Sequence, residues 1–208
     1  MRSVLKKVLE VCCWLMSIEV VGVAAQKMFE DELDIPEGVE VEVLDEKTIR
    51  VKGRLGSVTK SFNGVPVIIE KRDSKIKLTV YRKGRKGYAL INTIKNRIKN
   101  LFTGVEKGYT YKMRVYYIHF PMQVSVEGDQ VVIKNFAGER GNRYAKILPG
   151  VKVEVVKSGG DTDIIIKGVD KDAVGQTAAN IYHATKIKNK DPRVFLDGIY
   201  LYYKGEGM

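Results

Sequence analysis

The chain contains little of the side-chain chemistry on which most enzymes and metal proteins depend. Its 208 residues include two cysteines and two histidines. Cys12 and Cys13 are adjacent, so they can neither link distant segments nor complete a Cys/His zinc site. His119 and His183 have no cysteine or serine beside them in a nucleophilic arrangement, and no P-loop or dinucleotide-binding motif is present. We expect a reducing compartment and no catalytic residue, metal, cofactor or small-molecule substrate.

Long apolar runs are also scarce. One run, residues 11–25, follows Arg2, Lys6 and Lys7 and superficially resembles a secretory signal. Glu19 interrupts this run, which is too short to span a bilayer, so we expect no membrane partner and a cytoplasmic location. We interpret residues 1–34 as a leader. It is either an upstream extension of the reading frame, with Met16 or Met28 as the start, or an appended helix.

Positively charged residues outnumber negatively charged ones in this sequence. There are 36 Lys and Arg against 25 Asp and Glu, a formal net charge of +11 and a pI near 9.5. No tract rich in Pro, Gly and Ser interrupts the chain, so the body should be folded. The excess of positive charge favours polyanionic partners such as nucleic acid.

The same unit occurs twice. TIRVKGRLGS from Thr48 reappears as VVIKNFAGER from Val131, and VPVIIEK from Val65 recurs as VKVEVVK from Val151. The apolar ladder Ile91, Ile94 and Ile98 returns as Ala178, Ile181 and Thr185. Each half is just large enough to bury its own core. We predict a first domain over residues 35–117 and a second over residues 118–208.

Hydrophobic periodicity sets the fold class. Period-two alternation, as in Ile76, Leu78 and Val80, predicts strands with one apolar face. A helical stripe follows Gly84 and Gly87 and stops at Gly104; a second helix should run from about Ala173 to Lys188 behind an N-cap at residues 170–172. Its apolar face comprises Val174, Ala178, Ile181 and Tyr182. We predict an α+β fold, a tandem duplication in which one amphipathic helix covers each mostly antiparallel sheet, with a closing strand over residues 109–120 and a last strand over residues 199–203.

Long motifs carry a family resemblance. DKDAVGQTAANI from Asp170 and KNKDPRVFLDGIYLYYKGEG from Lys188 closely resemble the second domain of the large-subunit ribosomal protein six family, in its archaeal and eukaryotic branch, where the eukaryotic counterpart is protein nine. IPEGVEVEV, VKGRLGS and NFAGER extend the resemblance from about Leu33 to the end. It implies a structural protein that binds large-subunit rRNA, chiefly through the second domain, near the docking region of translation factors. Neighbouring ribosomal proteins are the other expected partners. His183 stands where a polar amide is expected.

Charge and resemblance together point to a set of rRNA-binding residues in the second domain. The set is Lys186, Lys188, Lys190, Arg193, Gln176, Asn180, Arg140, Arg143 and Lys204. Phosphate neutralisation by such cations would supply most of the affinity. The alternative is a solvated helix end, with the basic residues favoured there by the helix dipole; Gln176 and Asn180 could equally be plain surface groups.

The first domain carries a secondary basic patch, Arg82, Lys83, Arg85 and Lys86. Gly84 to Gly87 spell the GXXG of a KH loop, but that loop joins two helices, whereas a strand precedes this one. A strand-to-helix turn is the better interpretation.

Asp161 and Asp163 support an alternative function. Two carboxylates in a Gly-rich turn could hold a cation in a metal-dependent nuclease or RNA-processing factor, although such pairs are usually turn formers.

Overall fold

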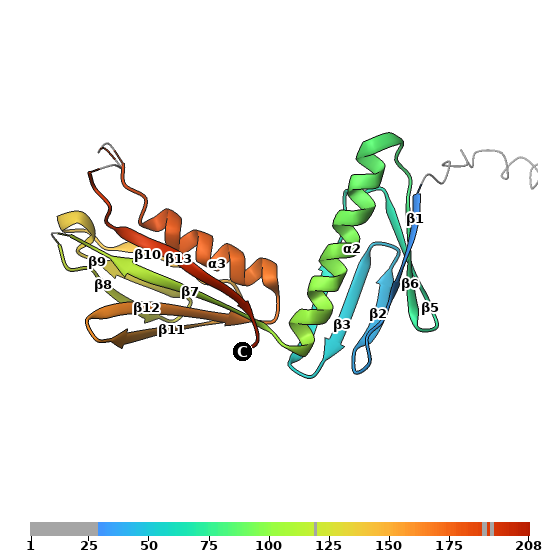
Figure 1. The fold of residues 1–208 in the computed structure, drawn as a ribbon, viewed down its shortest axis with the longest axis horizontal. Helices are drawn as coiled ribbons and strands as arrows, with labels where there is room; N and C mark the ends of the chain where they lie inside the picture. The colour runs from blue at the N-terminus through green and yellow to red at the C-terminus, as the bar shows by residue number, and fades with distance from the viewer. Residues whose placement is uncertain (1–28, 119, 189–190, 192–193) are drawn as a thin grey trace, which may run out of the picture.

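The structure is a computed structural model, and it describes residues 29–118, 120–188, 191 and 194–208. The described chain forms two domains side by side, each with one long helix (Figure 1). Among these residues, no helix is long and apolar enough to cross a membrane.

The described part of the first domain contains two three-stranded antiparallel sheets and one helix. Its elements are β1 (Phe29–Asp34), β2 (Glu40–Asp45), β3 (Thr48–Gly53), β4 (Gly56–Ser61), β5 (Val67–Arg72), β6 (Lys75–Val80) and α2 (Gly84–Glu106). The sheets have the strand orders β1-β6-β5 and β2-β3-β4. Helix α2 packs against both.

The second domain repeats this plan with one additional strand. Its elements are β7 (Tyr109–Tyr116), β8 (Gln123–Glu127), β9 (Gln130–Lys134), the 3-10 turn η1 (Phe136–Gly138), β10 (Arg143–Lys146), β11 (Val151–Ser158), β12 (Asp161–Gly168), α3 (Lys171–Ala184) and β13 (Gly198–Glu206). The sheets have the orders β11-β12-β7-β13 and β10-β9-β8, and all pairs are antiparallel. The predicted α+β class and mostly antiparallel pairing are confirmed, with two sheets in each unit.

Strand pairing sets the limits of each unit. β7 lies between β12 and β13, and its apolar side chains belong to the second core, whereas the sequence-based division placed residues 109–117 in the first domain. β1 pairs with β6, so residues 29–34 of the expected leader belong to the first domain. Residues 1–28, the remainder of that leader, lie outside the described residues. β7 is thus the counterpart of β1, and among the residues that the structure describes β13 has no counterpart in the first sheet.

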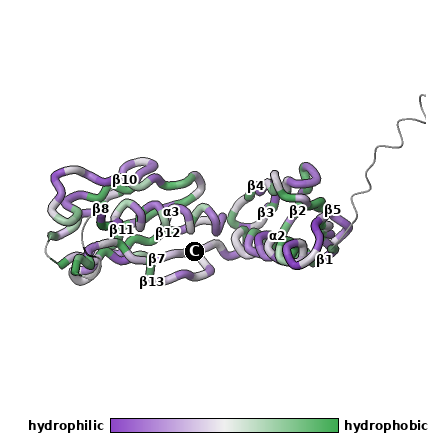
Figure 2. Tube along the Cα trace, turned by 90° about the horizontal axis from the view of Figure 1, so that it is seen from above, coloured by the Kyte–Doolittle hydropathy of each residue, from purple (hydrophilic) through white to green (hydrophobic). Residues whose placement is uncertain are grey.

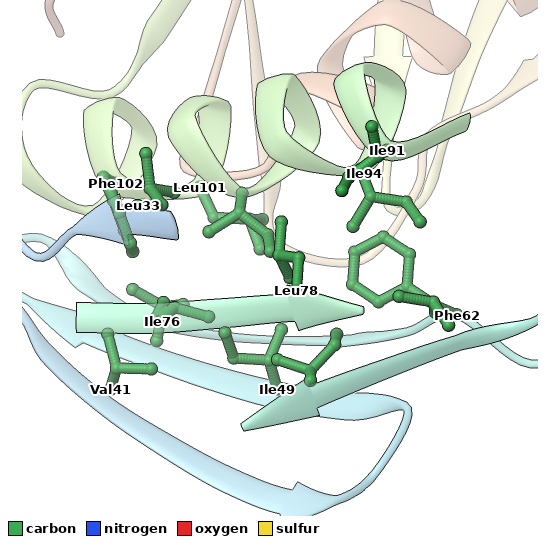
Figure 3. Packing of buried hydrophobic residues seen from close by; sticks show 14 of the residues in the cluster. Leu33, Val41, Ile49, Phe62, Ile76, Leu78, Ile91, Ile94, Leu101 and Phe102 are labelled. Atoms are coloured by element: carbon green, nitrogen blue, oxygen red, sulfur yellow. The ribbon is translucent and has the colours of Figure 1, made fainter. Parts of the chain in front are cut away.

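Each domain has its own hydrophobic core. Figure 2 shows hydrophobic and hydrophilic residues interspersed along the strands, and burial alternates along β3 and β12, so these strands turn one face to a core. In the first domain, Ile49, Ile76 and Leu78 from the strands are fully buried against Ile94 of α2 (Figure 3). Burying one such side chain contributes about 1.5–3 kcal/mol, so this packing holds the helix on the sheets.

The helix ends differ from the predicted ones. α2 continues through Gly104 to Glu106, because Gly104 is a packing position rather than a terminator. α3 ends at Ala184, four residues before the predicted Lys188. Its N-cap is as predicted: the Asp170 carboxylate accepts a hydrogen bond from the backbone N–H of Asp172 (2.9 Å).

Polar contacts join the two domains where α3 begins. Lys60 of β4 forms ion pairs with Asp172 (2.6 Å) and Asp170 (3.5 Å). Lys171 donates a hydrogen bond to Asn100 of α2 (3.2 Å). At the chain end, the N–H of Met208 donates to the carbonyl of Lys107 (3.1 Å). The N-terminus of α3 is therefore engaged within the protein.

Candidate nucleic-acid interface

The segment between α3 and β13, as far as the structure describes it, is fixed at both ends by buried polar residues. At its start, the Thr185 hydroxyl donates toward the carbonyls of Ile181 and Tyr182, and it accepts from the N–H of Ile199 (3.3 Å). At its end, buried Asp197 accepts from the N–H of Ile118 (2.8 Å). This bond ties the end of the segment to the exit of β7.

Arg143 fixes the same segment from β10. Its guanidinium donates to the carbonyls of Ala184 (2.8 Å) and Lys186 (3.1 Å) and to the carboxylate of Glu139 (2.6 and 2.8 Å). It also lies over the Phe136 ring, 4.2 Å from the centroid. A cation at the last carbonyls of a helix is favourable, and the fork satisfies two acceptors at once. Arg143, predicted as an RNA contact, is therefore occupied within the protein.

Gln176 and Asn180 lie on the exposed side of α3. The Gln176 amide donates to Asn180 (3.0 Å), and the Asn180 amide donates to the carbonyl of Lys146 (2.9 Å). The first bond lies within α3, and the second ties α3 to the last residue of β10. Both residues keep exposed surface, and Gln176 has more of it.

The predicted cations that the structure describes are exposed, except Arg143, which is half-buried. Lys186 and Lys188 follow α3, and Arg140 lies in the η1–β10 connection beside Arg143. The bonds from Arg143 to Glu139 and to the Lys186 carbonyl bring these two connections to one end of the domain. Lys204 stands apart on β13, and Lys190 and Arg193 lie outside the described residues. These cations form the candidate interface, with Arg143 as its anchor.

The secondary patch lies where α2 begins, at the end of the helix remote from the second domain (Figure 1). Arg82, Lys83, Arg85 and Lys86 are all exposed. The N-cap Lys83 makes no side-chain cap, and the first turn has no acidic residue. Basic side chains at a helix N-terminus are electrostatically unfavourable in isolation, so this end of α2 suits an anionic partner. The predicted strand-to-helix turn is confirmed between β6 and α2.

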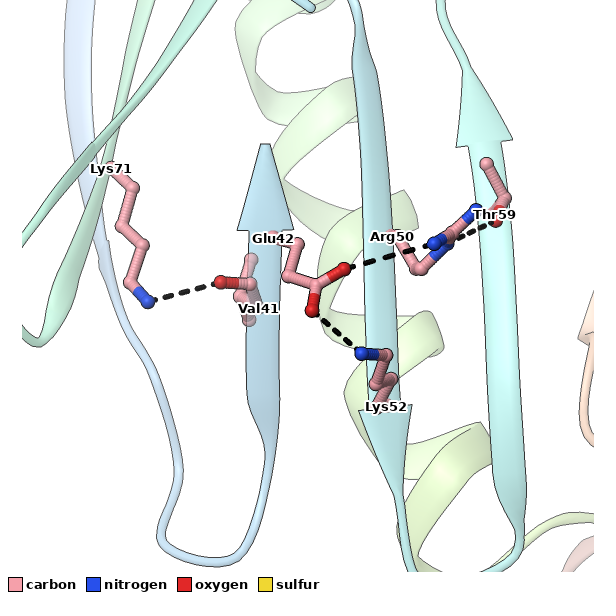
Figure 4. A network of polar contacts seen from close by, with 6 residues as sticks. All are labelled: Val41, Glu42, Arg50, Lys52, Thr59 and Lys71. Carbon is pink, nitrogen blue, oxygen red and sulfur yellow. Dashed lines mark hydrogen bonds and ion pairs between the residues drawn. The ribbon is translucent and has the colours of Figure 1, made fainter. Parts of the chain in front are cut away.

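Elsewhere in the first domain, basic residues are paired internally. On β2, β3 and β4, Lys52 donates to Glu42 (2.6 Å), Arg50 lies near Glu42 (3.8 Å), and Arg50 also donates to Thr59 (Figure 4). The hydrogen bond from Lys52, with nearby Arg50, lowers the pKa of Glu42. Lys71 donates to the carbonyl of Val41 (3.0 Å). This side of the first domain therefore has fewer free cations than its sequence indicates.

The carboxylates assigned to a possible metal site serve another purpose. Asp163 accepts two hydrogen bonds from Arg114 (2.8 and 3.1 Å), and Asp161 pairs with the same guanidinium (3.2 Å). The bonds from Arg114 and then Tyr202 lower the pKa of Asp163. A guanidinium between two carboxylates occupies the position that a cation would take. Within the described ranges, no cluster of three or more His, Cys, Asp or Glu residues could hold a metal ion.

Sequence reasoning missed a set of exposed tyrosines. Tyr182, predicted to join the apolar face of α3, is 44% exposed. Its ring lies beside those of His183 and Tyr200. Burial raises the pKa of Tyr200, helped by nearby Tyr182 and Asp197, which keeps its phenol neutral. Composition gave a signal, because all 11 tyrosines except Tyr81 and Tyr88 lie beyond residue 108.

The described residues thus define a duplicated α+β protein whose candidate site is a set of exposed cations rather than a catalytic centre. The family model described as ribosomal protein L6 matches residues 120–198. The large ribosomal subunit protein uL6 of Ignicoccus hospitalis is 46% identical over 175 residues, covering 82% of this chain and 91% of the relative. The uL6 proteins of Staphylothermus marinus and Methanothrix thermoacetophila are 47% and 44% identical, covering 85% and 83% of this chain and 95% of each relative. The chain belongs to the ribosomal protein L6 family.

Proposed function

We propose that this chain, a structural component of the large ribosomal subunit and not an enzyme, binds large-subunit rRNA mainly through its second domain. The observation that carries the proposal is the start of the segment after α3, where Thr185 and Arg143 fix the backbone of residues 184–186 while Lys186 and Lys188 face solvent. A fixed backbone lowers the conformational entropy that is lost when the lysines neutralise phosphates.

The other assignments extend this proposal. Arg140, Lys190, Arg193 and Lys204 add cations to the same domain, and Gln176 and Asn180 supply polar groups along α3. The patch at Arg82, Lys83, Arg85 and Lys86 makes weaker, less selective contacts from the first domain. Neighbouring ribosomal proteins complete the surroundings, near the region where translation factors dock, on cytoplasmic ribosomes.

Co-sedimentation with large ribosomal subunits tests the proposal. Subunits that lack the protein are mixed with the full chain and centrifuged through a gradient at high salt. A built-in structural protein should stay with the subunit, because folded rRNA and shape-matched contacts hold it in addition to surface charge. Release at high salt, with binding only at low salt, would indicate a loosely associated factor and contradict the proposal.

A fragment over Lys107–Met208 serves as the second arm of this experiment. It contains every strand of the second domain, and it should still sediment with the subunit. Loss of the fragment, with retention of the full chain, would assign the principal contacts to the first domain.

A further inference from the structure

Three exposed tyrosine rings from three separate elements converge beside the start of the segment that follows α3. Tyr116 comes from β7, Tyr182 from α3 and Tyr200 from β13, and we call them the tyrosine ridge. The Tyr200 ring centroid lies 6.0 Å from that of Tyr116 and 6.2 Å from that of Tyr182. All three rings are 37–48% exposed. A contiguous aromatic surface on a soluble domain needs an explanation.

A hollow lies on each side of the ridge, and a lysine stands in each. One hollow, of about 190 Å³, is lined by Tyr182 and Tyr200 together with Lys186. The other, of about 470 Å³ between α3 and β13, is lined by the same two tyrosines together with Lys204. Each hollow thus has one lysine, and the Asp197 carboxylate that also lines the smaller hollow accepts a hydrogen bond from the N–H of Ile118. This arrangement complements a polymer in which a flat ring is flanked by two negatively charged groups.

The first domain lacks this surface at the equivalent place. Lys95 follows buried Ile94 in α2 just as Tyr182 follows buried Ile181 in α3. Asp31 of β1 pairs with Leu78, as Met113 of β7 pairs with the equivalent Ile164. In the first copy, Lys95 and Asp31 form an ion pair (2.7 and 2.8 Å) that bridges helix and strand.

In the second copy the two charged positions hold Met113 and Tyr182, and both line the larger hollow together with Tyr111. The added strand β13 then contributes Tyr200 and Lys204 to the same place. The two copies have thus diverged from a closed ion pair to an open aromatic hollow. Core packing alone does not require this change, because Tyr182 remains exposed.

The orientation of the central ring is fixed within the protein. The Tyr200 hydroxyl donates to the carbonyl of Leu196 (3.3 Å). A Cβ atom at Gly198 would lie 3.0 Å from the Tyr200 ring, so glycine at this position lets the ring fold back beside Tyr116. A ring held in this way loses little freedom on binding.

Resting on the proposed rRNA-binding function, we propose that an unpaired nucleotide of the RNA stacks on the tyrosine ridge, with its flanking phosphates on Lys186 and Lys204. Unpaired bases are the part of folded RNA that aromatic side chains recognise, since bases within a helix are already stacked. Stacking on tyrosine tolerates any base, because every base has a π-face. The ridge therefore selects single-stranded structure rather than sequence, and the lysines add a salt-dependent contribution.

Two RNA hairpins with the same stem test this assignment with the full chain. One carries an unpaired 2-aminopurine nucleotide at a bulge, and the other is fully paired. The wild-type protein should bind the bulged RNA more tightly and quench the 2-aminopurine fluorescence. Tyr182→Ala should weaken binding to the bulged RNA about tenfold, with an unchanged salt slope and unchanged affinity for the paired RNA. Tyr182→Phe, which keeps the ring, should behave as wild type.

Tyr88→Ala is the matched control, because Tyr88 is also an exposed tyrosine on a helix surface. If Tyr182→Ala and Tyr88→Ala bind the bulged RNA equally well, or if wild type does not distinguish the two RNAs, the ridge assignment is wrong while rRNA binding stands. If wild type binds neither RNA and no large-subunit rRNA, the proposed function itself fails. If Tyr182→Ala leaves RNA binding unchanged but loosens the chain from the large subunit, the ridge contacts a protein and the nucleotide assignment is overturned.

Discussion

A Cβ atom added at Gly104 would lie 2.1 Å from the main-chain carbonyl oxygen of Val169. Gly104 belongs to α2 of the first domain, and Val169 immediately precedes the N-cap of α3 in the second. The two domains therefore meet at a main-chain contact that no side chain can enter. The ion pair between Lys60 and Asp172 lies at the same junction. This contact explains a glycine inside a long helix, where glycine is otherwise unfavourable.

Replacing Gly104 with Ala should destabilise the protein by about 1–3 kcal/mol, because the methyl group must push the domains apart or bend α2. The sign of the change in the free energy of unfolding is informative. If the junction could open freely, alanine would stabilise the helix by about 1 kcal/mol through propensity. Gly141→Ala is the control, since a Cβ atom at Gly141 meets nothing within 4 Å. Denaturant unfolding of both variants measures the difference, and a stabilised Gly104→Ala protein would contradict the tight junction.

The Lys60–Asp172 ion pair predicts a pH dependence at the junction. A hydrogen bond from Lys60 lowers the pKa of Asp172 against the opposing effect of burial. Because the folded pKa is depressed, the stabilisation is present above the ordinary carboxyl pKa and is lost as the pH falls through the folded value. Lys60→Met should raise the pKa of Asp172 toward its ordinary range, as followed by NMR titration of the carboxyl carbon. The exposed Lys83→Met serves as control, and an Asp172 titration unaffected by Lys60→Met would exclude the pair in solution.

Strand pairing predicts where the second domain can be cut. β7 lies in the middle of the four-stranded sheet, between β12 and β13. A fragment over Lys107–Met208 should therefore fold, whereas one that begins at Ile118 loses a central strand and should not. Circular dichroism and amide NMR dispersion distinguish the two outcomes. A well-folded fragment from Ile118 onward would place β7 outside the second domain.

Arg143 is predicted to act through the protein rather than by direct phosphate contact. Arg143→Gln should destabilise the Lys107–Met208 fragment by about 1–3 kcal/mol, because the carbonyls of Ala184 and Lys186 lose a charged donor. Arg143→Lys should recover only part of the lost stability, since one ammonium group cannot reproduce the several hydrogen bonds of the guanidinium. RNA affinity should fall with little change in salt slope. A lower salt slope with unaltered stability would instead identify Arg143 as a phosphate contact.

Sequence patterns predicted the fold class and the duplication because buried alternation recurs in both copies. They missed β1, whose sequence FEDELD is acidic and has low strand propensity. Pairing with distant residues stabilises this strand. The Glu30 carboxylate lies 3.0 Å from the Lys77 ammonium group, and the Asp31 carboxylate accepts a hydrogen bond from Lys95. The early end of α3 was not predicted either, because it depends on contacts within the folded protein. The Thr185 hydroxyl and the distant Arg143 donate hydrogen bonds to the last carbonyls of the helix.

The residue types of the candidate site could be predicted from the sequence, but their arrangement in space was harder to predict. Charge patterning predicted exposed lysines at this end of the domain, and Lys186 and Lys188 are exposed, although they follow α3 rather than form its last turn. The anchoring role of Arg143 and the convergence of Tyr182 with Tyr200 depend on contacts between elements that are far apart in the sequence. Residue type alone does not distinguish a cation that contacts RNA from one that holds a loop.

The salt dependence of rRNA binding tests the central claim most directly. The wild-type chain is compared with a variant in which Lys186, Lys188, Lys190 and Arg193 are replaced by Gln, on one large-subunit rRNA fragment. A matched variant carries Gln at Arg82, Lys83, Arg85 and Lys86. Each released cation should lower the slope of log affinity against log salt by about 0.7–0.9, so the first variant should lose about 3. We predict that loss for the second-domain variant, with the fold intact and a smaller change in the matched variant. An unchanged slope in the second-domain variant would mean that these residues are only a solvated helix end.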